Sequence, residues 1–145
     1  MMKSVSAWKQ ELSSGAHAAR LAALYCCAPD ETPAQAARYE AVLNGLDATF
    51  GPHAEAGLYS APGRTEIGGN HTDHQHGRVL AGSVNIDMIA AAAPNDKGQL
   101  RVQSEGYDLC IIDLDDLEAR KEEENTTASL LRGECAAFTQ RGAAL

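Results

Sequence analysis

The chain has 145 residues, 44% of them hydrophobic, and a formal net charge of -8. This length allows one domain or part of one, and the scattered lysines and arginines exclude a general nucleic-acid binder. Alanine supplies 26 residues, while Leu, Ile, Val and Phe together supply another 26. Because alanine buries little area, we expect a thin core, which fits a piece of a larger protein better than a complete globule.

The part of the chain before residue 51 is expected to be helical. Apolar residues recur at helical spacing over 5–28 and predict one helix there. Thr32 followed by Pro33 predicts an N-cap and a proline in the first turn of a second helix, which runs to about Leu46. The sequence Phe50-Gly51-Pro52 is expected to end this helical part.

The rest of the chain predicts a sheet followed by a helix. Short strands are expected, in chain order, at 57–61, 78–84, 87–93, 100–104 and 109–114. The acidic run 113–124 contains seven carboxylates against Arg120 and Lys121. Such a pattern resists burial and predicts a solvated loop or helix edge.

A final helix is expected after the acidic run. Asn125 or Thr126 can cap its start, and Gly142 can stop it. Its apolar positions fall on one predicted face, and they are Leu130, Leu131, Cys135 and Phe138.

Two further features concern the cell compartment. No apolar run approaches membrane-spanning length, and the N-terminus lacks the apolar centre of a secretory signal. We therefore expect a cytoplasmic protein with no membrane partner. The cysteines form no Cys-x-x-Cys pair and are expected to be reduced, with structural roles; they are Cys26, Cys27, Cys110 and Cys135.

The stretch 61–77, APGRTEIGGNHTDHQHG, carries the densest chemistry in the chain. Pro62-Gly63 predicts a turn after the preceding strand. Gly68-Gly69 allows the backbone to approach a ligand closely or to adopt a positive φ. The polar side chains between and after these glycines can then form directed hydrogen bonds to a ligand.

This stretch resembles the sugar-binding signature of galactokinases, members of the GHMP family of small-molecule kinases. Residues 61–64, Gly69 and 71–73 match that signature in order and spacing, and a weaker resemblance extends from about Leu58 to about Gly142. The resemblance implies the N-terminal portion of a galactokinase. Its implied fold is an incomplete α+β domain, like the GHMP-kinase N-terminal domain, with helices flanking a mixed β-sheet. It divides the chain into an N-terminal helical segment, 1–50, and this partial domain, 51–145.

The activity implied by the resemblance is ATP-dependent phosphorylation of galactose at its anomeric hydroxyl. The implied cofactors are ATP and Mg²⁺, and the implied substrate is galactose or a related hexose. By alignment, Arg64 is the catalytic residue beside the phosphoryl-acceptor oxygen, and Arg64, Asn70, His71 and Asp73 contact the sugar. Asn70 replaces the usual glutamate, so an amide stands where the family has a carboxylate. Glu66 is a candidate to supply that missing carboxylate.

Other parts of a kinase are not found in this sequence. It contains no Gly-Leu-Ser-Ser-Ser-Ala type phosphate loop, and Gly69-Asn70 stands where a Walker loop needs lysine and serine or threonine. We therefore expect the 145-residue chain to be inactive alone. The missing C-terminal part of the same protein is its expected partner.

Two alternatives remain open. The chain can be a non-catalytic sugar-binding or interaction module. It can also hold a metal at a hydrolase-like site, because a cluster rich in zinc-ligand types follows the glycines, namely His71, Asp73, His74 and His76.

Overall fold

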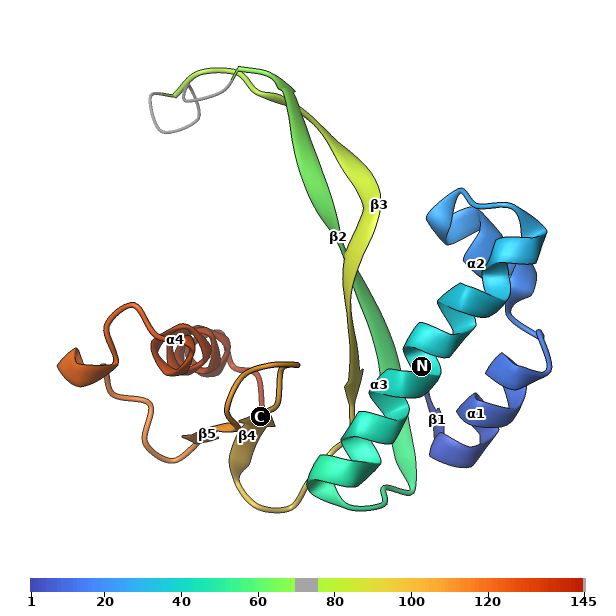
Figure 1. Ribbon diagram of the computed structural model, residues 1–145. Helices are drawn as coiled ribbons and strands as arrows, with labels where there is room; N and C mark the ends of the chain where they lie inside the picture. Colours follow the sequence, from blue (N-terminus) through green and yellow to red (C-terminus); the bar gives the residue numbers. More distant parts are fainter. Residues whose placement is uncertain (70–75, 145) are drawn as a thin grey trace. The chain divides into compact units, whose positions relative to one another are not determined.

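The computed structural model describes residues 1–69 and 76–144. The chain forms two compact units, Met1–Pro94 and Asn95–Leu145, each with its own set of packed elements (Figure 1). The four cysteines have no disulfide partner, as expected. Over the ranges that the structure describes, no helix is both long enough and apolar enough to span a bilayer.

The first unit begins with two short helices where the sequence predicted one. Strand β1 (Met2–Ser4) leads into α1 (Val5–Ser13), and α2 follows at Ala18–Tyr25. The prediction of a continuous helix over 5–28 is therefore wrong. Gly15 adopts a φ of 75°, a left-handed conformation that ends α1 and that glycine tolerates without a steric penalty.

Helix α3 (Thr32–Phe50) is the longest helix of the unit. A short 3-10 turn, η1 (Pro29–Glu31), precedes it. Thr32 is the first residue of α3 rather than its N-cap, and its hydroxyl donates a hydrogen bond to the Pro29 carbonyl at 2.8 Å. The helix continues one turn beyond the expected end and stops where Gly51 adopts a φ of 86°, which confirms the break expected at Phe50-Gly51-Pro52.

Strands β1, β2 (Glu55–Gly68) and β3 (Leu80–Ala92) form one antiparallel sheet in that order. β2 and β3 make a long two-stranded ribbon (Figure 1). The short strand expected at 57–61 and the two expected at 78–84 and 87–93 are thus wrong in extent. The α+β class is confirmed, but each strand pair that the structure describes is antiparallel, without the parallel pair of a mixed sheet.

The core of the first unit lies between the helices and the base of the ribbon. Trp8 donates a hydrogen bond from Nε1 to the Ala56 carbonyl at 2.8 Å, which ties α1 to β2. Leu43 and Ala56 are fully buried. The buried residues of this cluster are Val5, Trp8, Leu12, Leu21, Tyr25, Ala36, Tyr39, Leu43, Leu46 and Ala56. Residues before and after position 50 therefore share one core. The boundary expected there concerns family membership and stays a prediction.

The second unit consists of a hairpin and a helix. Strands β4 (Gln99–Val102) and β5 (Cys110–Asp113) pair antiparallel, close to the ranges expected. Helix α4 (Thr127–Gln140) begins after Thr126, whose side chain accepts a hydrogen bond from the Ser129 amide, and Gly142 follows its end with a φ of 81°. The predicted cap and stop are confirmed.

The orientation of α4 differs from the expected one. Cys135 and Arg132 are its buried residues, while Leu130 is 63% exposed and Phe138 is 52% exposed. The apolar positions predicted to share one face are therefore not equally covered, because Cys135 is buried while Leu130 and Phe138 are exposed. Arg132 is buried beside Cys135 instead.

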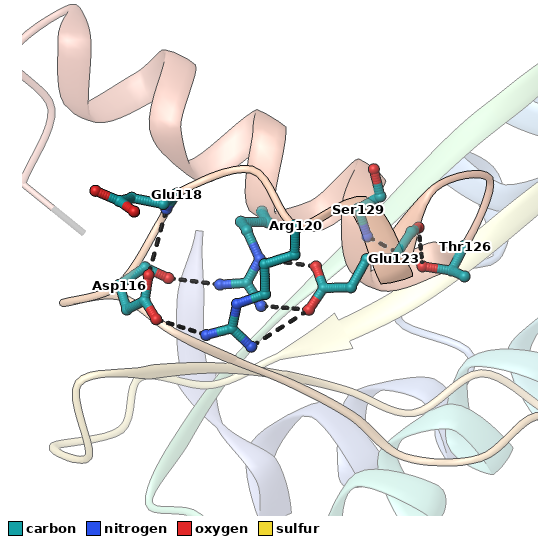
Figure 2. A network of polar contacts seen from close by, with 7 residues as sticks. Asp116, Glu118, Arg120, Glu123, Thr126 and Ser129 are labelled. Atoms are coloured by element: carbon teal, nitrogen blue, oxygen red, sulfur yellow. Dashed lines mark hydrogen bonds and ion pairs between the residues drawn. The ribbon is translucent and has the colours of Figure 1, made fainter.

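Arg132 of α4 holds part of the acidic run 113–124 in place. Its guanidinium donates two hydrogen bonds to Glu123, at 2.8 and 2.7 Å, and one to the Asp116 carbonyl. Figure 2 shows Asp116, Arg120 and Glu123 joined in the same network. The hydrogen bond from Arg132 lowers the pKa of Glu123. Part of the run is thus an ion-pair network around η3 (Lys121–Glu123), while most of its residues are exposed, as expected for a solvated loop or helix edge.

Candidate functional site

The stretch that resembles a sugar-binding signature begins inside strand β2. Pro62 pairs with Asp87 and Arg64 pairs with Ser83, with a register shift between them. The turn predicted at Pro62-Gly63 is therefore wrong, because the strand continues through it. A Cβ at Gly63 would lie 3.2 Å from the Ile86 carbonyl oxygen and from Val84 Cγ2, so glycine lets the two strands approach at this irregularity. Such irregularities change the direction of neighbouring side chains.

Arg64 and Glu66 lie on the same face of β2, because they are two residues apart in a strand. The distance from Arg64 Nη2 to Glu66 Oε1 is 3.8 Å. The Arg64 side chain is 74% exposed and that of Glu66 is 31% exposed. The structure thus brings the predicted catalytic cation and the candidate carboxylate together, with the guanidinium accessible to a ligand.

Gly69, directly after the end of β2, adopts a φ of 92°. A Cβ at this position would lie 2.3 Å from the Arg78 carbonyl oxygen. A side chain is therefore excluded at Gly69 both by conformation and by the neighbouring backbone. The expected positive φ is confirmed at Gly69, whereas Gly68 ends β2 and a Cβ built there would have no atom within 4 Å.

The other predicted site residues are Asn70, His71, Asp73 and His74, which lie outside the described residues. His76 is described and has a φ of 60°. Residues 1–69 and 76–144 contain no group of three His, Cys, Asp or Glu side chains able to hold a metal ion. The sugar contacts and the metal-site alternative both stay predictions.

The structure also reveals a buried carboxylate that the sequence analysis missed. Asp87 on β3 accepts hydrogen bonds from the Tyr25 hydroxyl at 2.6 Å, from the Ser60 hydroxyl at 2.5 Å and from Arg38 Nη2 at 2.7 Å. Tyr25 and Tyr39 also share a hydrogen bond at 2.8 Å. The Asp87 side chain is only 3% exposed. This cluster ties α2 and α3 to the ribbon at the position that pairs with Pro62.

The electrostatics of the cluster favour a charged Asp87. Burial alone would raise the pKa of this carboxyl, but the hydrogen bonds from Ser60, Tyr25 and Arg38 outweigh burial and lower it. Burial, with the hydrogen bond to Asp87, raises the pKa of the Tyr25 hydroxyl, so tyrosine remains a donor. The available signal was a lone acid inside 84–92, a stretch that is otherwise apolar except for Asn85.

A small cavity of about 70 Å³ adjoins this cluster, lined by Leu24, Tyr25, Ser60, Pro62, Val84, Asn85 and Asp87. Small-molecule pockets usually measure roughly 300–1,000 Å³. The cavity is therefore too small for a monosaccharide, and the buried cluster is a structural tie rather than a sugar pocket.

Comparison with known proteins shows that the ribbon of β2 and β3 matches a known family model. The family model described as the galactokinase galactose-binding signature matches residues 47–94, which include the end of α3, all of β2 and all of β3. This chain is related to the N-terminal portion of galactokinases. The resemblance found in the sequence is confirmed, and the galactokinase signature begins earlier than the stretch around Arg64 alone indicated.

Three curated galactokinases support this relationship. The chain is 29% identical to galactokinase of Lactobacillus helveticus over 96 residues, 65% of this chain and 24% of that protein. It is 32% identical to galactokinase of Bacillus subtilis (strain 168) over 107 residues, 71% of this chain and 27% of that protein. With galactokinase of Ligilactobacillus salivarius (strain UCC118), identity is 38% over 77 residues, 51% of this chain and 20% of that protein. The matches thus span about a quarter of these galactokinases. No solved structure matches the chain.

Proposed function

We propose that this chain supplies the sugar-binding region of a galactokinase-type kinase, a cytoplasmic protein that phosphorylates galactose at its anomeric hydroxyl. The observation that carries the proposal is the signature match over residues 47–94, which includes an accessible Arg64 on β2. The fold proposed for the complete region is that of a GHMP-kinase N-terminal domain. Galactose or a related hexose is the ligand.

The proposal assigns roles to five residues of the signature. Arg64 stabilises charge that develops on the transferred phosphoryl group, since its guanidinium stays charged in a protein. Asn70, His71 and Asp73 bind sugar hydroxyls. Glu66 is a further sugar ligand, and its place beside Arg64 on one face of β2 supports that role.

ATP and Mg²⁺ belong to the proposed reaction, but the described residues do not fit them. Within the described ranges no three metal-ligating side chains come together. The first amides of α4 face a threonine cap, where a phosphate site would need a glycine-rich loop. We therefore assign the sugar, and not the nucleotide, to this chain, and expect the 145 residues alone to form no ADP when galactose and ATP are supplied.

Isothermal titration calorimetry with galactose tests the sugar-binding role. We expect the chain to bind galactose weakly, and Asp73→Asn and Arg64→Ala each to lower the affinity roughly tenfold or more, the effect of losing one hydrogen bond to a charged group. Asn70→Glu is expected to raise it. Arg20→Ala, which removes an exposed arginine of α2, is the matched control and should have no effect.

The outcome that contradicts the proposal is equally defined. It is wrong if the chain binds no galactose, or if Arg20→Ala weakens binding as much as Arg64→Ala does. A stoichiometric zinc ion in the purified protein would favour the metal-site alternative instead, provided that the His74→Ala and His76→Ala variants no longer hold it.

A further inference from the structure

The pairing of β2 with β3 shifts in register directly before Arg64. The ladder is regular up to Pro62. If it continued, Arg64 would pair with Asn85, yet its partner is Ser83. Residues 84–86 of β3 therefore form a bulge, two residues longer than the matching stretch of β2. At roughly 3.4 Å per residue, a regular ladder would displace Arg64 by about 7 Å along β3.

The middle residue of the bulge is tied to the end of helix α2. Asn85 donates a hydrogen bond from Nδ2 to the Tyr25 carbonyl at 3.2 Å. Tyr25 is the last residue of α2, which ends where Cys26 adopts a φ of 48°. The last carbonyls of a helix have no partner within that helix, so this carbonyl can accept a bond from the ribbon. Flattening the bulge into a regular ladder would move Asn85 and break the bond.

The same tyrosine also holds the last pair of the regular ladder. Asp87, which belongs to that pair, accepts a hydrogen bond from the Tyr25 hydroxyl at 2.6 Å. Tyr25 is itself only 3% exposed and lies in the core of the unit. It therefore contacts β3 twice, through its hydroxyl at Asp87 and through its carbonyl at Asn85. Two bonds from one buried residue fix where the ladder stops and where the bulge begins.

The bulge has packing contacts as well as hydrogen bonds. Val84 is half-buried and, with Asn85 and Leu24, lines the cavity of about 70 Å³ beside α2. On the opposite side, a Cβ at Gly63 would lie 3.2 Å from the Ile86 carbonyl oxygen. Glycine at this position of β2 therefore leaves room for the bulge. Bulges of this kind change the direction of neighbouring side chains and often lie next to functional sites.

We propose that Asn85 is a positioning residue for the sugar site, which holds the bulge against α2 and so sets the register that places Arg64. Glu66 lies two residues further on the same face of β2 and is placed with Arg64. Asn85 does not touch the sugar and acts through the strand pairing alone. The ligand in this inference rests on the proposed function, whereas the register can be measured without any ligand.

NMR spectroscopy of the full chain without ligand tests the effect on register. In the unchanged protein, nuclear Overhauser contacts should join the backbones of Arg64 and Ser83. Asn85→Ala should shift the register equilibrium roughly several-fold, the effect of one lost hydrogen bond. The Arg64–Ser83 contacts should then weaken, and contacts from Arg64 to position 85 should appear. Asn85→Asp keeps the shape of the side chain but has no donor, and it should act more strongly because a carboxylate repels the carbonyl.

Two control variants separate register from stability. Trp8→Phe removes a different side-chain donor to a backbone carbonyl in the same unit, so it should lower stability and leave the register unchanged. Asn95→Ala is matched to Asn85→Ala in residue type. Asn95 also donates from Nδ2 to a backbone carbonyl, at 3.1 Å, but it does so in the second unit. Its substitution should change neither the register nor the affinity for galactose.

Calorimetric titration with galactose tests the consequence for binding, with the fold of each variant checked by circular dichroism. Asn85→Ala and Asn85→Asp should each lower the affinity roughly tenfold, as expected for loss of the Arg64 contact. The inference is overturned if the Arg64–Ser83 contacts persist undiminished in both variants, or if the register shifts and the affinity does not fall. If the unchanged chain binds no galactose, the proposed function fails, and the register measurements alone decide whether Asn85 holds the bulge.

Discussion

Truncation of Leu43 tests whether the core of the first unit is correctly located. Leu43 is fully buried within the helix cluster. Leu43→Ala removes three carbon groups, worth roughly 2.4 kcal/mol at about 0.8 kcal/mol each. The cavity left behind raises the expected cost to about 3–4 kcal/mol. A unit of about 94 residues has only about 5–14 kcal/mol of stability in total, so this single change removes a large share of it.

Urea denaturation measures this loss directly. Trp8 is the only tryptophan in the chain and lies in the same cluster as Leu43, so its fluorescence reports unfolding of the first unit. In a thermal melt of Leu43→Ala followed by the same fluorescence, the midpoint of unfolding is expected to fall by about 12–30 °C. Leu24→Ala is the matched control, because Leu24 is 50% exposed and should cost about 0.5 kcal/mol or less. If both substitutions cost the same, the packing described for this core is wrong.

Three further predictions concern single contacts. Trp8→Phe leaves the buried Ala56 carbonyl without its indole donor and should lower the free energy of unfolding by about 1–3 kcal/mol, measured by denaturation followed by circular dichroism. Asp87 has a lowered pKa in the folded protein, so its contribution to stability is present above about pH 4 and is lost as pH falls through the folded pKa. Asp87→Asn should therefore make the free energy of unfolding less dependent on pH in this acid range. An unchanged pH dependence would contradict the cluster. Thr126→Ala removes the cap of α4 and should cost about 1 kcal/mol, while Thr139→Ala at the other end serves as the control.

Local signals in the sequence predicted the two ends of α4 well. Thr126 and Gly142 mark the boundaries of α4 because a side-chain cap and a left-handed glycine act within one turn. The apolar spacing over 5–28 predicted helix correctly but missed the break at Gly15. A single exposed glycine weakens a helix by only about 1 kcal/mol, so periodicity alone cannot distinguish a tolerated glycine from a break.

Features set by distant partners were not predictable from local patterns. Pro62-Gly63 has the composition of a turn, yet pairing with β3 keeps it in a strand. The burial of Asp87 depends on donors 27 to 62 residues away in sequence. For the site, the resemblance predicted Arg64 and its neighbours, and this assignment stays a prediction; only the strand register shows that Arg64 and Glu66 share a face.

The contact at Gly69 has a practical meaning for protein engineering. Since the Arg78 carbonyl would lie 2.3 Å from a Cβ at Gly69, the scaffold itself holds together the two points between which the polar half of the signature is inserted. A segment with fixed, adjacent ends can be exchanged as a cassette, because swapping its residues adds little loop-closure cost and leaves the strand register untouched. If the proposed sugar-binding role holds, libraries of replacement segments between these two points are expected to vary ligand preference while the supporting framework stays constant.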